Sequence, residues 1–308
     1  MKRNLCLFLL SPFLLAGVAC GGHGSKKPVD VVIISGQSNA VGCTWSWHLS
    51  ETMGIEKKTD YEEGFDENKV QIAYACWTKN WELNPATFDL QNQSYGAFVK
   101  VRLGQGNGSE TFGPEIGISE ELQDKLERKL FLIKFACGAA NLKDDFMTRT
   151  SPMYPRMIEY IENRISDLKK KGYEPTIKAF CWMQGEGDTY AGYYDVYQQS
   201  TRTFVSNLRE DLNKYAGGKN LPFIDAGICE SSPSWPSPGN VRVNEAKQAF
   251  AAESPDNYYL DTVAAGLHTD QEGQLFDADT AHYDSESQID LGHMFAQAFE
   301  PFLGPDNK

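Results

Sequence analysis

Short apolar runs alternate with amphipathic segments along most of the chain, and this alternation limits the folds open to it. Such runs are typical of strands buried on both faces of a sheet. Strands joined by helices need crossover connections, so we expect a mainly parallel sheet covered on both faces, a three-layer α/β/α sandwich with a flavodoxin-like strand order. The expected strands cover residues 30–35, 130–136, 177–183, 222–228 and 258–263, and the expected helices between and after them cover 153–170, 193–215, 241–252 and 285–302.

Two helix starts carry local sequence signals. The stretch Phe112-Gly113-Pro114-Glu115 predicts a helix that runs to about Arg128, with proline near its first turn. Ser285 and Gln288 have the spacing of a capping box, which predicts the start of the last helix.

The segment from Cys43 to Asn107 breaks the alternation. It lacks helical periodicity, contains two strand-like pieces at 70–76 and 97–103, and holds four tryptophans, Trp45, Trp47, Trp77 and Trp81. A long aromatic loop often forms one wall of a binding site. It is equally well explained as a structural insertion held together by its own aromatic side chains.

A serine follows the first expected strand directly, in Gly36-Gln37-Ser38-Asn39. Glycine allows a sharp turn there, and ligands bind at the carboxyl edge of the sheet in open α/β folds. A serine hydroxyl becomes a nucleophile only beside a base that an acid orients. The segment Asp279-Thr280-Ala281-His282 supplies both partners near the other end of the chain.

These residues suit acyl transfer. Ser38 would attack an ester carbonyl, His282 would take its proton, and Asp279 would hold the imidazole in the correct tautomer. The oxyanion needs hydrogen-bond donors. The backbone N–H groups of Ser38 and Gly138 and the side-chain amide of Gln184, all at the ends of expected strands, are the candidates.

Three motifs in this order resemble the SGNH/GDSL hydrolase superfamily: Gly36-Gln37-Ser38-Asn39, Trp182-Met183-Gln184-Gly185-Glu186 and Asp279-x-x-His282. Within it, the sequence is similar to the sialate O-acetylesterase and carbohydrate acetylesterase branch, which includes acetylxylan esterases. Phe112-Gly113-Pro114-Glu115 and the Cys137-Gly138 turn also match that branch, although Cys137-Gly138-Ala139-Ala140 lacks its common Gly-Gly-Thr. The resemblance covers nearly all of the chain after Lys27 and implies the same roles for Ser38, Gly138, Gln184, Asp279 and His282.

The resemblance implies an exported serine esterase that removes O-acetyl groups from an acetylated oligo- or polysaccharide, without a metal or cofactor. Gln37, Asn39 and Trp235 are the expected substrate-binding residues. Acetylxylan or a related glycan is the expected substrate, and a sialate O-acetylesterase or a non-catalytic carbohydrate-binding lipoprotein are the alternatives. Some members of the branch have a glutamate near the histidine, so Glu186 competes with Asp279 as the orienting acid.

The N-terminus predicts export. Lys2 and Arg3 precede an apolar run that ends at Ala19, which is typical of a signal peptide over residues 1–19. Cys20 resembles a lipoprotein acylation site, but Gly17 stands where leucine is usual, so cleavage without lipid stays open. Residues 20–28 suit a flexible tether, which leaves 29–304 as the esterase domain. We expect a periplasmic or cell-surface lipoprotein, and a freely secreted enzyme is the alternative.

The chain is acidic, with a net charge of −13. This charge argues against nucleic acid and against anionic membranes as electrostatic partners, so membrane attachment would depend on the N-terminal lipid. Five cysteines remain beyond Cys20, and an odd number leaves at least one thiol unpaired. Since three of them end apolar runs, we expect free core thiols rather than disulfides. The five are Cys43, Cys76, Cys137, Cys181 and Cys229.

Overall fold

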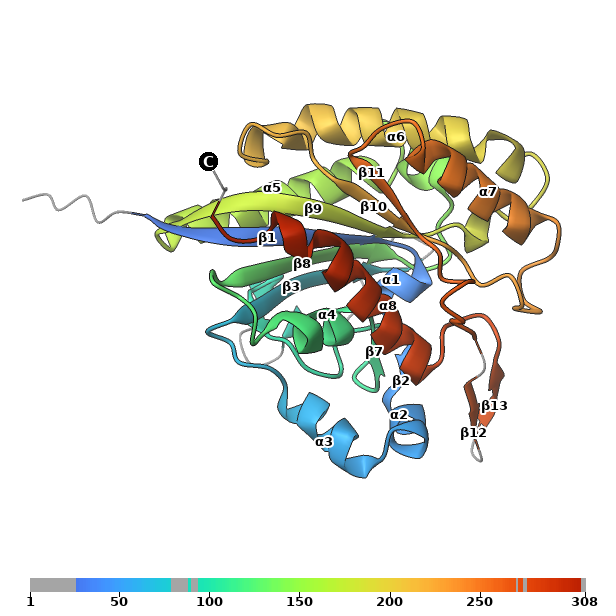
Figure 1. Cartoon of the computed structure of the whole chain (residues 1–308), viewed down its shortest axis with the longest axis horizontal. Helices are drawn as coiled ribbons and strands as arrows, with labels where there is room; N and C mark the ends of the chain where they lie inside the picture. Colours follow the sequence, from blue (N-terminus) through green and yellow to red (C-terminus); the bar gives the residue numbers. More distant parts are fainter. Residues whose placement is uncertain (1–25, 79–87, 90–93, 270, 274–275, 306–308) are drawn as a thin grey trace, which may run out of the picture.

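The computed structural model describes residues 26–78, 88–89, 94–269, 271–273 and 276–305. The expected signal peptide and most of the expected tether lie outside these ranges. The described residues form a central sheet of seven strands in the order β11-β10-β9-β1-β8-β3-β6 (Figure 1). The strands are β1 (Lys27–Gly36), β3 (Val70–Trp77), β6 (Val99–Lys100), β8 (Leu130–Cys137), β9 (Tyr173–Met183), β10 (Phe223–Ala226) and β11 (Asn257–Leu260).

All neighbouring strands of this sheet are parallel except β3 and β6. β3 and β6 come from the segment 43–107 and extend one edge of the sheet. The remaining strands lie in the order β8-β1-β9-β10-β11, which is the flavodoxin order when they are numbered along the chain. The predicted fold class and strand order are therefore confirmed.

Helices cover both faces of the sheet: α4 (Glu115–Leu122) and α8 (Ser285–Phe299) on one, and α5 (Tyr154–Lys170), α6 (Tyr197–Leu212) and α7 (Gly239–Ala251) on the other (Figure 1). Two adjacent residues of β8 show the division, since successive side chains of a strand point to opposite faces. Lys134 reaches Glu115 of α4 at 2.9 Å, whereas the Phe135 ring packs against Tyr160 of α5. The central strands are thus buried on both sides.

Two glycines let α4 and α8 lie directly against each other. A Cβ atom on Gly117 would come within 2.0 Å of the Ile289 carbonyl oxygen, and one on Gly292 within 2.4 Å of the Pro114 carbonyl oxygen. Any larger residue would force the two helices apart. This contact fixes α8, whose first turn lies beside the residues that follow β1.

The segment 43–128 differs from its expected structure. Besides α4 it contains two helices that no helical periodicity predicted, α2 (Ser46–Thr52) and α3 (Ile55–Glu63). Tyr61 is the only buried residue of α3, so this polar surface helix has no apolar stripe to recognise. The expected strand at 97–103 is reduced to β6, and the expected helix to Arg128 already ends at Leu122. Trp81 lies outside the described residues.

Three short antiparallel pairs complete the strands: β2 (Thr44–Trp45) with β7 (Thr111–Phe112), β4 (Phe88–Asp89) with β5 (Ser94–Tyr95), and β12 (Gln271–Gly273) with β13 (Phe276–Asp279). In Figure 1, β12 and β13 project from the body of the protein beside the start of α8. The acid of the Asp279-x-x-His282 motif therefore ends a strand that lies outside the central sheet.

The predicted capping box at the start of α8 is wrong. Asp284 is the N-cap, and its carboxylate accepts the Ser287 N–H at 2.7 Å. Ser285 instead lies inside the helix, and the Gln288 side chain donates to the Asn39 carbonyl oxygen at 3.2 Å. The Gln288 side chain therefore contacts the residue after Ser38 rather than the first turn of α8.

The five cysteines beyond Cys20 all lie in the described ranges and none forms a disulfide, as the sequence predicts. Four of them are buried, and Cys43 is half-buried. Burial raises the pKa of Cys76 and that of Cys137 to about 12. These core thiols therefore stay protonated and act as small apolar side chains.

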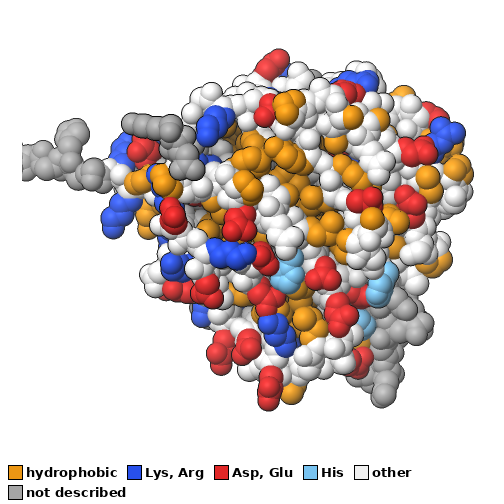
Figure 2. All heavy atoms as spheres, in the orientation of Figure 1, with side chains coloured by type: hydrophobic (Ala, Val, Ile, Leu, Met, Phe, Trp, Pro, Cys, Tyr) orange, Lys and Arg blue, Asp and Glu red, His pale blue; other side chains and the backbone are white. Residues whose placement is uncertain are grey.

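The face of the molecule that carries α8 has no single acidic patch. Figure 2 shows acidic side chains spread over the face that carries α8, with basic side chains between them and hydrophobic side chains gathered above that helix. Among the described helices, none is long and apolar enough to span a membrane.

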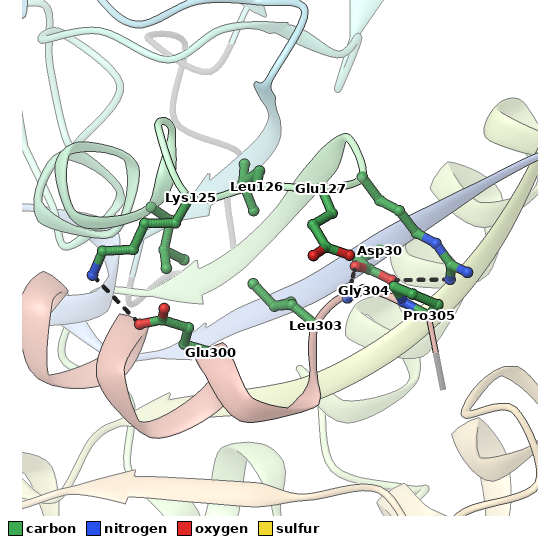
Figure 3. A pocket seen from close by; sticks show the side chains of 10 residues that line it. Asp30, Lys125, Leu126, Glu127, Glu300, Leu303, Gly304 and Pro305 are labelled. Atoms are coloured by element: carbon green, nitrogen blue, oxygen red, sulfur yellow. Dashed lines mark hydrogen bonds and ion pairs between the residues drawn. The ribbon is translucent and has the colours of Figure 1, made fainter. Parts of the chain in front are cut away.

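The C-terminal residues close the edge of the sheet at which β1 begins. The Gly304 N–H donates to Asp30 at 2.7 Å beside a cavity of about 230 Å³, as Figure 3 shows. Lys178 and Arg128 lie 3.7 and 4.0 Å from the other Asp30 carboxylate oxygen. Burial nevertheless raises the pKa of Asp30. This cavity lies at the edge opposite the serine loop.

The turn after β1 generates a stability prediction. Gly36 has a φ of 140°, and a Cβ atom there would lie 1.9 Å from the Met183 carbonyl oxygen. Gly172 also has a positive φ, of 84°, but has open space around it. We expect Gly172→Ala to cost about 1–2 kcal/mol for the left-handed backbone alone. Gly36→Ala should cost more than about 4 kcal/mol, because backbone must also move. Urea unfolding of both variants measures the difference, and equal losses would contradict the prediction.

Candidate functional site

Ser38 begins α1 (Ser38–Val41), the short helix directly after β1. The preceding turn is tied to β9, because the Gln37 N–H donates to the Met183 carbonyl oxygen at 2.9 Å. The first residue of a helix has no carbonyl four residues earlier to accept its N–H. Ser38, which is 8% exposed, therefore lies at the carboxyl edge of the sheet with an N–H that its helix does not use.

Asp279 and His282 form a compact unit after β13. The two carboxylate oxygens of Asp279 are used differently: Oδ1 accepts the N–H groups of Ala281 and His282 at 2.9 and 3.2 Å, and Oδ2 lies 2.8 Å from Nδ1 of the His282 ring. The backbone bonds fix the carboxylate, and the carboxylate fixes the ring. The structure thus brings the predicted acid and base together.

The charges of this pair stabilise each other. Burial lowers the pKa of His282, but Asp279 and the neighbouring Cys43 thiol outweigh it and raise the pKa from 6.5 to about 10. Burial raises the pKa of Asp279, but its bond to His282 outweighs this effect and lowers the pKa overall. The resting imidazole is therefore mainly protonated at neutral pH and must lose a proton before it can act as a base.

Asn39 joins the serine to the histidine segment. Its side-chain oxygen accepts the Tyr283 N–H at 3.1 Å, and its side-chain nitrogen donates to Glu186 at 2.6 Å. Residues adjacent to Ser38 and to His282 are thereby bonded to each other. Asn39 is 1% exposed, so the structure gives it an internal bridging position rather than the surface position expected of a substrate-binding residue.

The two candidate acids lie in different surroundings. Asp279 contacts the imidazole, whereas the Glu186 carboxylate accepts from Asn39 and is 1% exposed. Burial raises the pKa of Glu186, although Asn39, Lys247 and His282 oppose the effect. This geometry favours Asp279 as the acid that orients His282 and places Glu186 behind Asn39.

Gln184 and Gln37 form a buried hub beneath the serine. The Gln184 amide nitrogen donates to Asp188 at 2.6 Å, to Gln37 at 3.1 Å and to the Ala140 carbonyl oxygen at 3.3 Å. The Gln37 side-chain oxygen also accepts the Gly187 N–H at 3.0 Å. Both glutamines are 0% exposed. Their amides hold strand ends together, which counts against Gln184 as an oxyanion donor and Gln37 as a substrate-binding residue.

The turn after β8 also differs from the prediction. The Gly138 N–H donates to the Trp77 carbonyl oxygen at 2.8 Å, so this predicted oxyanion donor is already bonded within the sheet. The next residue, Ala139, is exposed and has a φ of 57°, a conformation that costs a non-glycine residue energy. Within the described residues, the Ala139 N–H has no protein acceptor. Ala139 is therefore the better-placed donor of this turn.

Trp235 lies on the loop before α7 and is half-buried. Its indole N–H donates to the Ala281 carbonyl oxygen at 3.3 Å, directly before His282. The structure thus places this predicted substrate-binding residue against the Asp279–His282 segment through one edge of its ring.

Sequence reasoning missed four residues of this site: Cys43, Ala139, Ser232 and Ser234. A strained turn residue and a thiol close to the histidine have no signal in a single sequence. The serine- and proline-rich loop at 231–239 is visible in the sequence, but nothing in it indicates which of its serines contact Thr280. Among the described residues, no group of three or more His, Cys, Asp or Glu side chains is arranged to hold a metal ion.

A model of the family "Carbohydrate esterase, sialic acid-specific acetylesterase" matches residues 28–300. The chain belongs to this family. A curated relative from Arabidopsis thaliana, the probable carbohydrate esterase At4g34215, is 26% identical over 191 residues, which is 61% of this chain and 63% of that protein. The predicted membership of a carbohydrate acetylesterase branch is thereby confirmed.

Three solved structures share the fold of this chain. The Arabidopsis protein superposes with a TM-score of 0.59 at 21% identity, covering 90% of this chain and 100% of its own. NanS gives a TM-score of 0.61 at 12% identity, with 90% and 98% covered. XAC1771, a carbohydrate acetylesterase from Xanthomonas citri, gives a TM-score of 0.55 at 14% identity, covering 89% of this chain and 56% of its own. At these identities the likeness supports the fold of this carbohydrate esterase.

The ion pair generates a prediction about pH. We expect kcat/KM to rise with pH through neutrality toward about 10, because only the neutral His282 imidazole can accept a proton. Asp279→Asn should move this rise to lower pH, since the partner that raises the pKa is removed, and should cost about 10⁴-fold in turnover. Glu186→Gln is the matched control, and we expect it to lower turnover while leaving the rise close to its wild-type position. Initial rates of acetate release across pH measure both, and the reverse pattern would exchange the roles of the two acids.

Proposed function

We propose that this carbohydrate esterase is an exported serine O-acetylesterase that uses Ser38, His282 and Asp279. The observation that carries the proposal is the 2.8 Å contact between Asp279 and His282, on a segment bonded to the residue next to Ser38. A serine, an imidazole and a carboxylate in this relation suit acyl transfer. Membership of the family supports a carbohydrate as the alcohol part of the ester.

The reaction has two halves. Neutral His282 takes the hydroxyl proton of Ser38 as Oγ attacks the acetyl carbonyl carbon. The bond to the sugar oxygen then breaks, that oxygen takes the proton from His282, and acetyl-Ser38 remains. A water molecule attacks the acetyl group while His282 takes one of its protons, and Ser38 regains a proton as acetate leaves. Asp279 orients the ring and stabilises the imidazolium in both halves.

The oxyanion donors we assign are backbone N–H groups of Ser38 and Ala139. The Ser38 N–H begins a helix and therefore lies at its positive end. Ala139 has a strained backbone at the exit of the neighbouring strand β8, which is typical of a functional turn. Both groups lack an acceptor among the described residues, whereas the N–H groups of Gly138 and Gln184 are bonded within the protein.

The substrate we propose is acetylxylan or a related acetylated glycan. O-acetylated sialic acid is the alternative, and the description of the family, which names a sialic acid-specific acetylesterase, supports it. Both substrates carry a small acyl group on a sugar, so the same catalytic residues serve either.

The serine mechanism is tested by Ser38→Ala. We expect it to abolish acetate release from acetylated xylan and sialic acid and from a small acetyl ester, because the nucleophile is lost while α1 keeps its backbone. Ser231→Ala, an exposed serine of another loop, is the matched control and should keep wild-type activity. Full activity in Ser38→Ala would contradict the mechanism. Wild type that binds these glycans without releasing acetate would support a carbohydrate-binding protein instead.

We further propose that Cys20 carries a lipid and that the enzyme works in the periplasm or at the cell surface. β1 begins at Lys27 and is 10 residues long, so about 30 Å separate the start of β1 from the serine loop. An anchor on the N-terminal side of β1 would therefore attach the domain at the edge of the sheet opposite the serine loop.

Cell fractionation tests the anchor. We expect wild type in the membrane fraction and Cys20→Ala in the soluble fraction, because the second lacks the thiol that would be acylated. Cys43→Ala controls for the loss of a thiol elsewhere and should stay with the membrane. Soluble wild type with an unmodified N-terminus would contradict the proposal.

A further inference from the structure

The loop between β10 and α7 contains three residues that bind the segment joining Asp279 to His282. We call Ser232–Trp235 the strap. Its contacts fall on Thr280 and Ala281, the two residues between the acid and the base. The Ser232 hydroxyl donates to the Thr280 carbonyl oxygen, the hydroxyls of Ser234 and Thr280 lie 2.8 Å apart, and the Trp235 indole N–H donates to the Ala281 carbonyl oxygen at 3.3 Å.

The strap is itself anchored to the body of the protein. The buried Asn240 side chain donates to the carbonyl oxygen of Glu230 at 2.7 Å, just before the strap, and to that of Trp235 at 3.3 Å, at the end of the strap. A Cβ atom on Gly239 would lie 1.7 Å from the Thr189 carbonyl oxygen, so the end of the loop passes directly against the residues after β9. The strap is therefore a fixed support for the segment that it contacts.

The segment needs such a support. Thr280 and Ala281 follow β13, belong to no helix or strand, and are half-buried. β13 is one strand of a pair outside the central sheet, so the sheet that positions Ser38 does not position Asp279. The Asp279 carboxylate sets the geometry within its own turn, but groups from outside the turn must set where that turn lies.

We propose that Ser232, Ser234 and Trp235 are positioning residues, which hold the Asp279–His282 turn in register with Ser38. This inference rests on the proposed serine esterase function and extends it. Asn39 secures the C-terminal side of His282 through Tyr283, and the strap secures the N-terminal side through Thr280 and Ala281. Because the His282 segment is held on both sides, the imidazole keeps one position. Proton transfer between the imidazole and Ser38 requires such a fixed geometry.

Trp235 has a competing role, because an exposed face of its ring could stack on a sugar. The size of the substrate separates the two roles. A small acetyl ester such as p-nitrophenyl acetate has no sugar ring, so a stacking role would leave its hydrolysis unchanged. A positioning role affects every substrate, because each one depends on the same imidazole.

The experiment compares Trp235→Phe and Ser232→Ala with wild type in the full chain. Trp235→Phe removes the indole N–H and keeps an aromatic ring, and Ser232→Ala removes one hydroxyl. Ser231→Ala is the matched control, because Ser231 lies in the same loop and its hydroxyl contacts Cys229 rather than Thr280 or Ala281. We expect kcat on the small ester to fall roughly three- to tenfold in each strap variant, with KM unchanged and the control at wild-type level.

A second readout does not depend on activity. The strap variants should loosen the contact between Asp279 and His282, and the NMR titration of the His282 ring should then shift to lower pH. Ser231→Ala should titrate as wild type does. If wild type releases no acetate at all, the proposed function fails, and the ring titration still decides whether the strap positions the histidine.

Two results would overturn the inference. One is that both strap variants retain wild-type kcat on the small ester and wild-type titration of His282. The other is that Trp235→Phe raises KM for acetylated glycan alone, which would make the residue part of a sugar subsite. If one of the two strap variants folds poorly, the other one still tests the inference, because each change removes a different hydrogen bond to the same segment.

Discussion

The site depends on two hydrogen bonds that the Asn39 side chain makes. Its amide bonds Glu186, 147 residues away along the chain, and Tyr283, 244 residues away. A parallel sheet brings strand ends to one edge but leaves their loops free by several ångströms, whereas acyl transfer needs its groups placed to about 0.5 Å. The Asn39 side-chain nitrogen donates one hydrogen bond and its oxygen accepts another, and the second connects the turn that carries Ser38 to the segment that carries His282. Burial shields both bonds from water.

The opposite end of α1 is held by a buried charge. The Lys134 ammonium donates to the carbonyl oxygens of Val41 and Gln105 at 2.9 and 2.7 Å and pairs with Glu115, and both charged side chains are 0% exposed. Breaking such a pair by removing one partner typically costs about 3–5 kcal/mol. A helix of four residues is too short to persist alone. Bonds at both of its ends therefore make α1 a fixed platform for Ser38.

The sequence was most informative where burial forces a pattern. The apolar runs predicted the central strands and their order, because a strand covered on both faces has few alternatives. The contact between Asp279 and His282 could be expected from their spacing of three residues. The donors were less predictable. Gln184 and Gly138 occupy the expected strand exits, but tertiary contacts decide whether an N–H faces substrate or a neighbouring carbonyl. Likewise α3 has no apolar stripe, and Gln288 bonds across the fold rather than within α8.

Glu186 and Asp279 show how surroundings divide the work between two carboxylates. Asp279 is half-buried and accepts two backbone N–H groups in addition to the imidazole, so its charged form is favoured and its pKa is lowered. Glu186 is buried, one of its oxygens has no hydrogen bond among the described residues, and its pKa is raised. A carboxylate that keeps its charge can stabilise an imidazolium, whereas a buried one is better suited to hold a neutral amide. In the proposed mechanism the His282 base therefore takes its orientation from Asp279, and Glu186 supports the turn that carries Ser38 through Asn39.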